Sequence, residues 1–197
     1  MLFINGAAGN MAPIYSTYPN PGSAHLSQFR VLLGDRILEA NKQIVTNIPE
    51  VKLFTGKTFV ETPRKEGLGW PSDLGAYTRT TADGKNLIRL PIRFLKINQD
   101  IAIWSLPVEL FCEISNEIRD RSPYTYTFYY GYTNGWLGYF PPASQFQYGG
   151  YEIETVCPYT TQAESDLKNA VMSYLTGRMR GVSNSTQSIV NYPSLVE

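Results

Sequence analysis

Hydrophobic and polar positions alternate along residues 88–94. The apolar positions are Ile88, Leu90, Ile92 and Phe94, and the residues between them are Arg89, Pro91 and Arg93. This period of two predicts a half-exposed β-strand. Residues 101–104 are predicted to run back as its hairpin partner after a turn at 98–100. Two more strands are predicted at 51–61, where polar and apolar residues interleave, and at 124–132, which is rich in aromatic and β-branched residues.

Two other segments carry apolar residues at helical spacing. The first begins at Ser23 and continues to residue 47, which predicts a one-sided helix packed on a sheet. The second begins at a capping box formed by Thr161 and Glu164 and ends near Gly177 or Gly181.

A third helix is predicted to begin at the Leu-Pro-Val-Glu turn of residues 106–109. Pro107 suits the first helical turn, and the positive end of the helix dipole favours a charged Glu109. Leu110, Ile114 and Ile118 would then face the core, and the opposite, solvated side would carry Glu113, Glu117 and Arg121. Together these elements predict an α/β fold, a mixed β-sheet flanked by helices.

Two stretches lack periodicity. Residues 63–84 form the longest irregular stretch, and loops of that length are usually functional lids or disordered segments. From residue 181 onward Ser, Thr, Asn and Gln dominate, so we expect a domain at 1–180 and a loosely packed polar extension at 181–197.

Composition excludes several classes of function. Seventeen basic and seventeen acidic residues cancel, so no net field attracts nucleic acid or an anionic membrane. The two cysteines, Cys112 and Cys157, are too few for a disulfide framework or a zinc knuckle and are predicted to be free buried thiols. No apolar run is long enough to span a membrane, and the first residues lack the pattern of a signal peptide.

A glycine-spaced segment, residues 131–139, follows the aromatic strand. Strand ends followed by glycine loops are common places for sites in α/β proteins. Because the predicted hairpin leads directly into residue 106, the sheet is expected to present Glu109 near this loop.

These motifs carry a resemblance to a known family. The Leu-Pro-x-Glu turn at 106–109, the Gly-Tyr-x-Asn-(x)3-Gly-Tyr pattern at 131–139 and the Gly-Gly-Tyr-Glu of 149–152 resemble the neutral/alkaline non-lysosomal ceramidases and their uncharacterised bacterial relatives. The loop at 5–13 is similar to the family's Gly-Ala-Ala-Gly-Asp-x-x-Pro loop. The resemblance runs in order from residue 2 to about 180 and implies that this chain is the C-terminal portion of a ceramidase-like catalytic domain. The predicted strand at residues 2–4 agrees with this expectation, because a domain rarely begins inside a core strand.

The resemblance implies a zinc site in which Glu109 and Tyr139 are two of the ligands. The other two are histidines in the family's N-terminal part, whereas the single histidine here, His25, lies in neither family histidine motif. The N-terminal part of the same domain or a separate chain would have to supply them, and the isolated chain is expected to be inactive. Without the resemblance, Glu109 reads as a helix cap and Tyr139 as a core residue.

The loop at 5–13 departs from the family. Asn10 stands where the family has an aspartate, and Ala12 stands where it has the active-site serine. The backbone amides of Gly6, Ala7, Ala8 and Gly9, together with Asn10, are predicted to bind an oxyanion or a polar head group, with a plain tight turn as the alternative.

The favoured function is zinc-dependent hydrolysis of an amide-linked lipid, an N-acylsphingosine or a related N-acyl compound. A non-catalytic remnant or binding domain that has lost the metal is the alternative, and a tyrosine-rich glycan or lipid head-group surface around 124–132 and 148–151 is a third. The resemblance implies a secreted, periplasmic or cell-surface protein. Both a monomer and a homo-oligomer stay open.

Overall fold

The computed structural model describes residues 4–12, 29–45, 51–70, 74–177 and the backbone of 185–189. Its contacts divide the chain into two units. The first unit comprises Met1–Met11 and Lys52–Ile189, and the second comprises Ala12–Val51 and Val190–Glu197. Leu2, Phe3 and His25 lie outside the described residues, while Ile4 is exposed and lies outside any strand.

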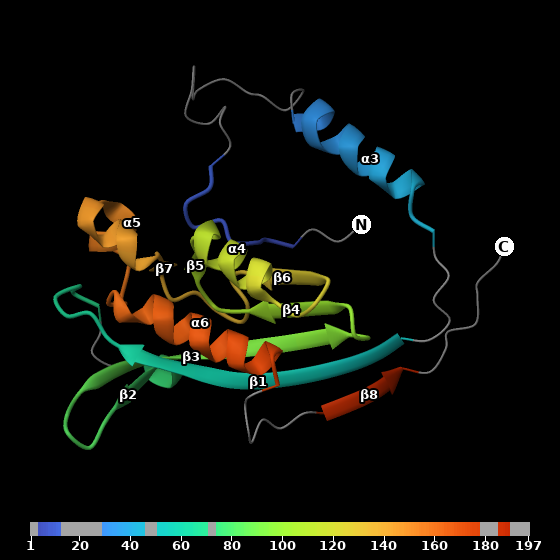
Figure 1. Ribbon diagram of the computed structural model, residues 1–197. Coiled ribbons are helices and arrows are strands. Elements are labelled where there is room, and N and C mark those ends of the chain that lie inside the picture. Colours follow the sequence, from blue (N-terminus) through green and yellow to red (C-terminus); the bar gives the residue numbers. More distant parts are fainter. Residues whose placement is uncertain (1–3, 13–28, 46–50, 71–73, 178–184, 190–197) are drawn as a thin grey trace. The chain divides into compact units, whose positions relative to one another are not determined.

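A six-stranded mixed sheet forms the centre of the first unit (Figure 1). Its order is β6-β4-β3-β1-β8, and β2 also pairs with β3. β3 is antiparallel to β1, β2 and β4, whereas β4 and β6 are parallel. The strands are β1 (Val51–Pro63), β2 (Thr78–Thr80), β3 (Asn86–Ile97), β4 (Ile101–Ser105), β6 (Tyr126–Tyr130) and β8 (Ser185–Ile189).

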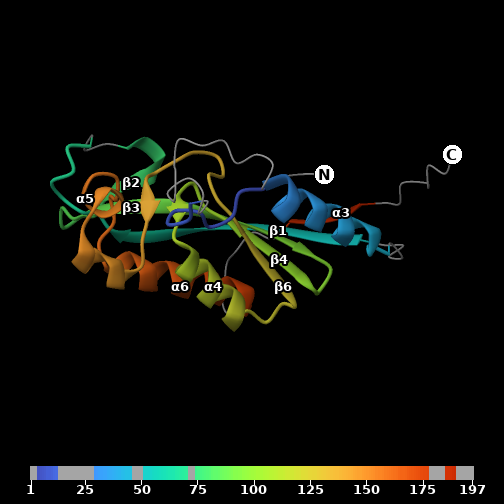
Figure 2. The same cartoon turned by 90° about the horizontal axis from the view of Figure 1, so that it is seen from above.

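Helices cover one face of this sheet (Figure 2), which confirms the predicted α/β class. They are α4 (Cys112–Arg121) and α6 (Gln162–Leu175), and a shorter α5 (Tyr151–Glu154) follows the 3-10 turn η3 (Ala143–Tyr148). The alternation predicted for 88–94 is confirmed, because its four apolar side chains are buried toward these helices.

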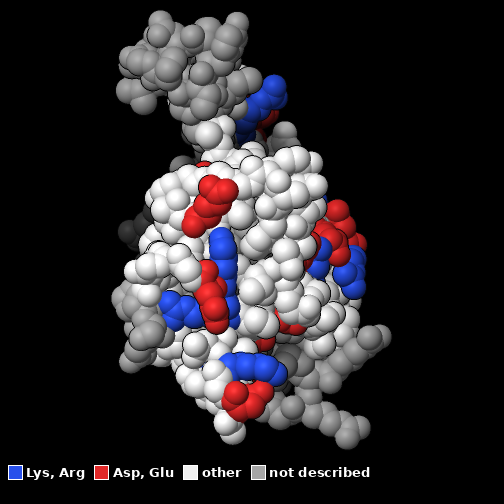
Figure 3. Space-filling model, turned by 90° about the vertical axis from the view of Figure 1, so that its left-hand side faces the viewer, with Lys and Arg blue, Asp and Glu red and all other residues white. Residues whose placement is uncertain are grey.

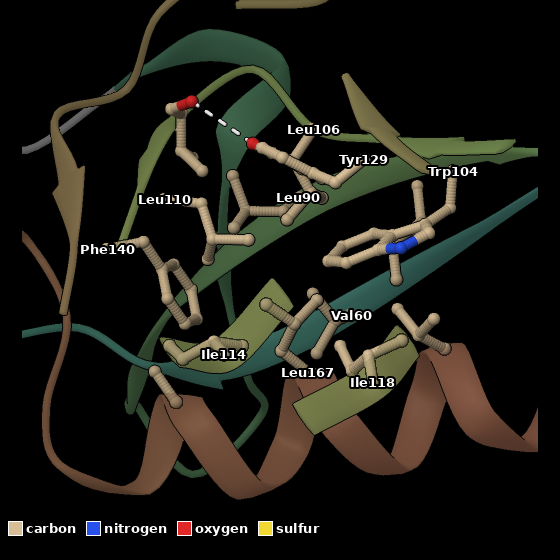
Figure 4. Packing of buried hydrophobic residues seen from close by; sticks show 14 of the residues in the cluster. Val60, Leu90, Trp104, Leu106, Leu110, Ile114, Ile118, Tyr129, Phe140 and Leu167 are labelled. Atoms are coloured by element: carbon tan, nitrogen blue, oxygen red, sulfur yellow. Dashed lines mark hydrogen bonds between the residues drawn. The ribbon is translucent and has the colours of Figure 1, made fainter. Parts of the chain in front are cut away.

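The core lies between the sheet and the two longer helices. Ile114 and Ile118 of α4 and Leu167 of α6 meet Val60 and Leu90 of the sheet, all nearly or fully buried (Figure 4). Burying side chains of this size contributes roughly 1.5–3 kcal/mol each. Both cysteines are free, but only Cys157 is buried; Cys112 is partly exposed.

The helix predicted from Thr161 onward is confirmed, but its predicted capping box is wrong. Thr161 already has helical backbone angles and makes no side-chain capping bond. The Glu164 carboxylate instead accepts hydrogen bonds from the Ala143 backbone N–H, at 2.7 Å, and from Lys168. The helix ends at Leu175, near the first of the two predicted glycines, and Gly177 follows with a φ of +70° that suits glycine.

One strand lies within the predicted polar extension. Ser185–Ile189 form strand β8 beside β1 at the edge of the sheet, so pairing continues past residue 181. The irregular stretch 63–84 contains two short elements, η2 (Gly75–Tyr77) and β2. An edge strand is held by backbone hydrogen bonds to one neighbour and can form without a periodic apolar pattern. The polar composition of this segment therefore did not predict β8.

The second unit contains the helix predicted between residues 23 and 47. Its described part is a π-helical turn, η1 (Arg30–Gly34), followed by α3 (Asp35–Lys42). No described residue of either element is buried within this unit, and Leu38 is 62% exposed. That this helix packs on a sheet stays a prediction. No helix in the described part of the chain is long and apolar enough to cross a bilayer.

Candidate functional site

Glu109 and Tyr139 lie directly opposite each other in a small parallel pair of strands. β5 (Glu109–Leu110) pairs with β7 (Tyr139–Phe140), with Glu109 in register with Tyr139. The Glu109 backbone N–H donates to the Gly138 carbonyl at 3.0 Å. The prediction that Glu109 opens a helix is therefore wrong: α4 begins three residues later at Cys112, and the helix dipole does not act on Glu109 as a first-turn residue.

The glycine-spaced segment is held along residues 106–109 by backbone hydrogen bonds. Thr133 N–H donates to the Leu106 carbonyl at 3.1 Å, and Leu137 N–H donates to the Pro107 carbonyl at 2.7 Å. Gly138 turns the chain into β7 with φ +69°, and a Cβ there would lie 2.1 Å from the Val156 carbonyl oxygen. Only glycine fits this position without displacing backbone.

Three side chains of this segment converge on the Glu109 carboxylate. Trp136 Nε1 donates to Glu109 Oε1 at 2.7 Å. Tyr132 and Tyr139 lie close enough to the same carboxylate for it to raise the pKa of both phenols. We call Glu109, Tyr132, Trp136 and Tyr139 the Glu109 cluster.

Tyr132 reaches the cluster through an unfavourable backbone conformation. Its φ is +55°, in the left-handed region that a bulky residue rarely adopts and that costs on the order of 1–3 kcal/mol. The neighbouring backbone compensates, because Gly131 N–H donates to the Asn5 carbonyl at 2.9 Å. Strain of this kind is concentrated at functional sites, which supports assigning Tyr132 to the site.

Both phenols of the cluster are held in their neutral form. Partial burial, a hydrogen bond to Glu109 and the charge of Glu109 raise the pKa of Tyr139 to about 12. The same three causes raise the pKa of Tyr132 well above its usual value. At neutral pH both hydroxyls therefore carry a proton that they can donate to the carboxylate.

Exposed aromatic rings border the polar cluster. The Trp70 and Trp136 ring centroids lie 6.2 Å apart, and the Tyr151 ring meets Tyr139 edge-on at 6.3 Å. Trp136 and Tyr151 remain 46% and 59% exposed. A carboxylate ringed by exposed aromatic surface suits a molecule with both a polar group and an apolar body.

The N-terminal loop supports this region from the other side. Gly9 N–H donates to the Leu110 carbonyl at 2.9 Å, and a Cβ on Gly9 would lie 2.5 Å from the Glu109 carbonyl oxygen. The amide of Gly9 is thus already used within the fold, which leaves Gly6, Ala7 and Ala8 for the predicted oxyanion site. Ala12 is exposed and belongs to the second unit.

The structure brings together the two ligand candidates but adds two residues that sequence reasoning missed. Tyr132 and Trp136 lie inside the motif at 131–139, but the sequence predicts a ligand role in that motif for Tyr139 alone. The sequence feature that could have identified them is their position between glycines, because bends at glycines can turn successive aromatic side chains toward one point.

The donor set of the cluster fits a zinc ion in part. A carboxylate is an ordinary zinc ligand and a phenol oxygen is a rarer, hard one. Within the described residues no three His, Cys, Asp or Glu side chains are grouped to hold a metal ion. Glu109 and Tyr139 therefore provide two oxygen donors, and a four-ligand site needs two donors from elsewhere.

Charges of both signs are interspersed on the side of the molecule that carries α5 and β7 in Figure 1. Figure 3 shows Lys and Arg beside Asp and Glu on that face, with large uncharged areas between them. This face therefore has no large area of purely positive or purely negative electrostatic potential.

Comparisons with known proteins give two partial structural likenesses. No protein-family model and no characterised protein sequence matches the chain. The chain is similar to neutral ceramidase from Pseudomonas aeruginosa, with a TM-score of 0.41 and 16% identity over 46% of this chain. It is also similar to a ceramidase complexed with C2, with a TM-score of 0.40 and 18% identity over 47%. The matches cover 15% and 16% of those chains.

Proposed function

We propose that the Glu109 cluster is part of the zinc site of a ceramidase-like hydrolase that acts on an amide-linked lipid or a related N-acyl compound. The proposal is carried by the parallel register of Glu109 and Tyr139. These are the two positions that the sequence motifs match to metal ligands, and they lie thirty residues apart in the chain but opposite each other in the fold.

Glu109 and Tyr139 would hold the metal with two imidazoles from the N-terminal part of the same domain or from a separate chain. Bound zinc would supply a Lewis acid for the amide carbonyl and an acidified water. The chain's own residues prepare the ligands. Trp136 fixes Glu109 Oε1 by its 2.7 Å hydrogen bond, which orients the carboxylate as second-layer partners of metal ligands commonly do.

The aromatic border supports the proposed substrate class. Trp136 and Tyr151 present apolar surface next to the polar cluster, which suits the acyl or alkyl part of an amphiphile. Ala12 has no hydroxyl where the resembling family has a serine, so recognition of the head group must differ from the family's. We therefore propose an N-acyl substrate without committing to ceramide.

A non-catalytic binding domain is the second candidate, and one observation favours it. The Glu109 carboxylate already accepts a hydrogen bond from Trp136 and lies beside the neutral phenols of Tyr132 and Tyr139, and a carboxylate held in this way can anchor a loop without any metal. In that case the cluster would only fix the segment 131–139 to β5.

Zinc binding separates the two candidates. Calorimetric titration would be made on the chain alone and on the chain mixed with any polypeptide encoded upstream of it that carries histidines, while tyrosinate absorbance is followed at neutral pH. We expect one zinc per complex only in the mixture, together with ionisation of one tyrosine.

The controls assign the ligands. Glu109→Gln should abolish stoichiometric binding, and Tyr139→Phe should remove the tyrosinate signal. Tyr148→Phe changes a tyrosine that is 74% exposed and should behave like the wild type. Absence of zinc in the mixture would reject the hydrolase and leave the binding domain.

A further inference from the structure

A cavity of about 510 Å³ lies at the end of the core farthest along α4 from the Glu109 cluster. Phe54 and Lys96, which are partners in the β1–β3 register, form its floor. Tyr124, just after α4, and Leu175, the last residue of α6, form its sides. α4 has ten residues, so about 15 Å of helix separates this cavity from the cluster.

Lys96 is the one charged residue among those that line the cavity. Its Nζ lies 5.8 Å from the Tyr124 ring centroid and 5.0 Å from that of Tyr174. Within the described part of the chain, no ion pair or hydrogen bond is recorded for this ammonium group. Aromatic faces hold the cation in place but do not neutralise it as a carboxylate would.

Of the neutral polar side chains that line the cavity, Asn98 is the one that is partly buried. The Asn98 carbonyl oxygen accepts a hydrogen bond from the Lys52 backbone N–H at 2.9 Å. The group that Asn98 can offer to a ligand is therefore its NH₂, a donor. The cavity thus combines one cation, the Asn98 amide donor and apolar side chains with two exposed polar residues, Gln99 and Thr176, and its volume is within the usual range of small-molecule sites.

We propose that this cavity binds a monocarboxylate with a compact apolar or aromatic body. The carboxylate would pair with Lys96 and accept from Asn98, while Phe54, Tyr124 and Leu175 would cover the apolar part. A neutral polar head would leave the ammonium unpaired, and a second cation would be repelled. This site is separate from the Glu109 cluster and does not depend on the function proposed for it.

The test compares two ligands with the same phenylbutyl body, one ending in a charged carboxylate and the other in a neutral hydroxyl. Binding of 4-phenylbutyrate and of 4-phenylbutan-1-ol to the full chain would be measured by calorimetry. A charge-assisted hydrogen bond contributes roughly 1.5–3 kcal/mol, so the carboxylate should bind about tenfold or more tightly than the alcohol.

Variants test whether Lys96 causes the preference for the carboxylate over the alcohol. Lys96→Gln should bring the two affinities to about the same value, whereas Lys96→Arg should keep the preference. Lys57→Gln is the matched control, because Lys57 lies on the same sheet but points to the opposite face from Phe54. Thr176→Trp, at the exposed rim, should block both ligands without removing the charge.

Two results would overturn the proposal. One is the absence of saturable binding of 4-phenylbutyrate by the wild-type chain. The other is a preference for the carboxylate that survives Lys96→Gln, since the ammonium would then play no part.

Discussion

The side-chain amide of Asn10 donates to both carboxylate oxygens of Glu113, at 2.9 and 2.8 Å, across 103 positions of sequence. The Asn10 carbonyl oxygen also accepts from the Cys112 backbone N–H at 3.0 Å. One side chain thus caps the first turn of α4 and ties it to the N-terminal loop. Because Glu113 is its partner, the amide at position 10 suits this fold better than the aspartate of the resembling family.

Asn10→Asp should destabilise the protein. The substitution keeps the size of the side chain but replaces the donor NH₂ by an oxygen, which places two carboxylates about 3 Å apart. We expect a loss of about 1–2 kcal/mol in the free energy of unfolding, measured with urea at neutral pH.

The double variant Asn10→Asp with Glu113→Gln restores a donor facing an acceptor and should recover most of the loss. Equal stability of Asn10→Asp and the wild type would show that this contact does not hold the loop in solution.

Glu109→Gln should make Tyr139 a stronger acid. In the folded protein the pKa of Tyr139 is raised to about 12, by burial first and then by its hydrogen bond to Glu109 and the charge of Glu109. Replacing the carboxylate by an amide removes the charge and leaves the burial, so the pKa should fall toward the ordinary value of 10.0. Titration of ring-labelled tyrosines by NMR, with Tyr139→Phe for assignment, measures the change.

The same shift has a consequence for stability against pH. A phenol whose pKa is raised on folding binds its proton more tightly in the native state than in the unfolded state. Its contribution is fully present below pH 10 and is lost as pH rises from about 10 to about 12. Alkaline unfolding should therefore depend less steeply on pH in Tyr139→Phe, and an identical profile would contradict the coupling.

Gly138→Ala should be among the most damaging single changes near the site. Its Cβ would lie 2.1 Å from the Val156 carbonyl oxygen, in a left-handed conformation with φ +69°. Because backbone must move, we expect a loss above about 2 kcal/mol in a urea titration, together with loss of the Glu109–Tyr139 register.

Gly67→Ala is the matched control for this change. Gly67 also has a positive φ, +82°, but a Cβ there meets nothing within 4 Å. It should show only the backbone strain of about 1 kcal/mol, so the difference between the two variants reports the steric contact at Gly138. Similar losses in both would mean that the Val156 carbonyl has room to move.

Local patterns were sufficient to predict most of the elements of this protein. The alternation at 88–94 predicted β3 because one face of the sheet is buried and the other is not. The buried stripe of Leu167, Val171, Tyr174 and Leu175 predicted α6 for a similar reason. Hydrophobic periodicity indicates which face of a helix or strand is buried, provided that one face is buried and the other is exposed.

Tertiary contacts decided the site. Glu109 lies in a strand and not in a helix because its backbone N–H bonds to Gly138, a partner that a local pattern cannot reveal. The same holds for β8, which a polar sequence forms by pairing with the edge of β1. The order of the motifs could single out Glu109 and Tyr139. Their register follows from long-range backbone hydrogen bonds. Tyr132 and Trp136 reach the same carboxylate because of backbone angles that are set only in the folded chain.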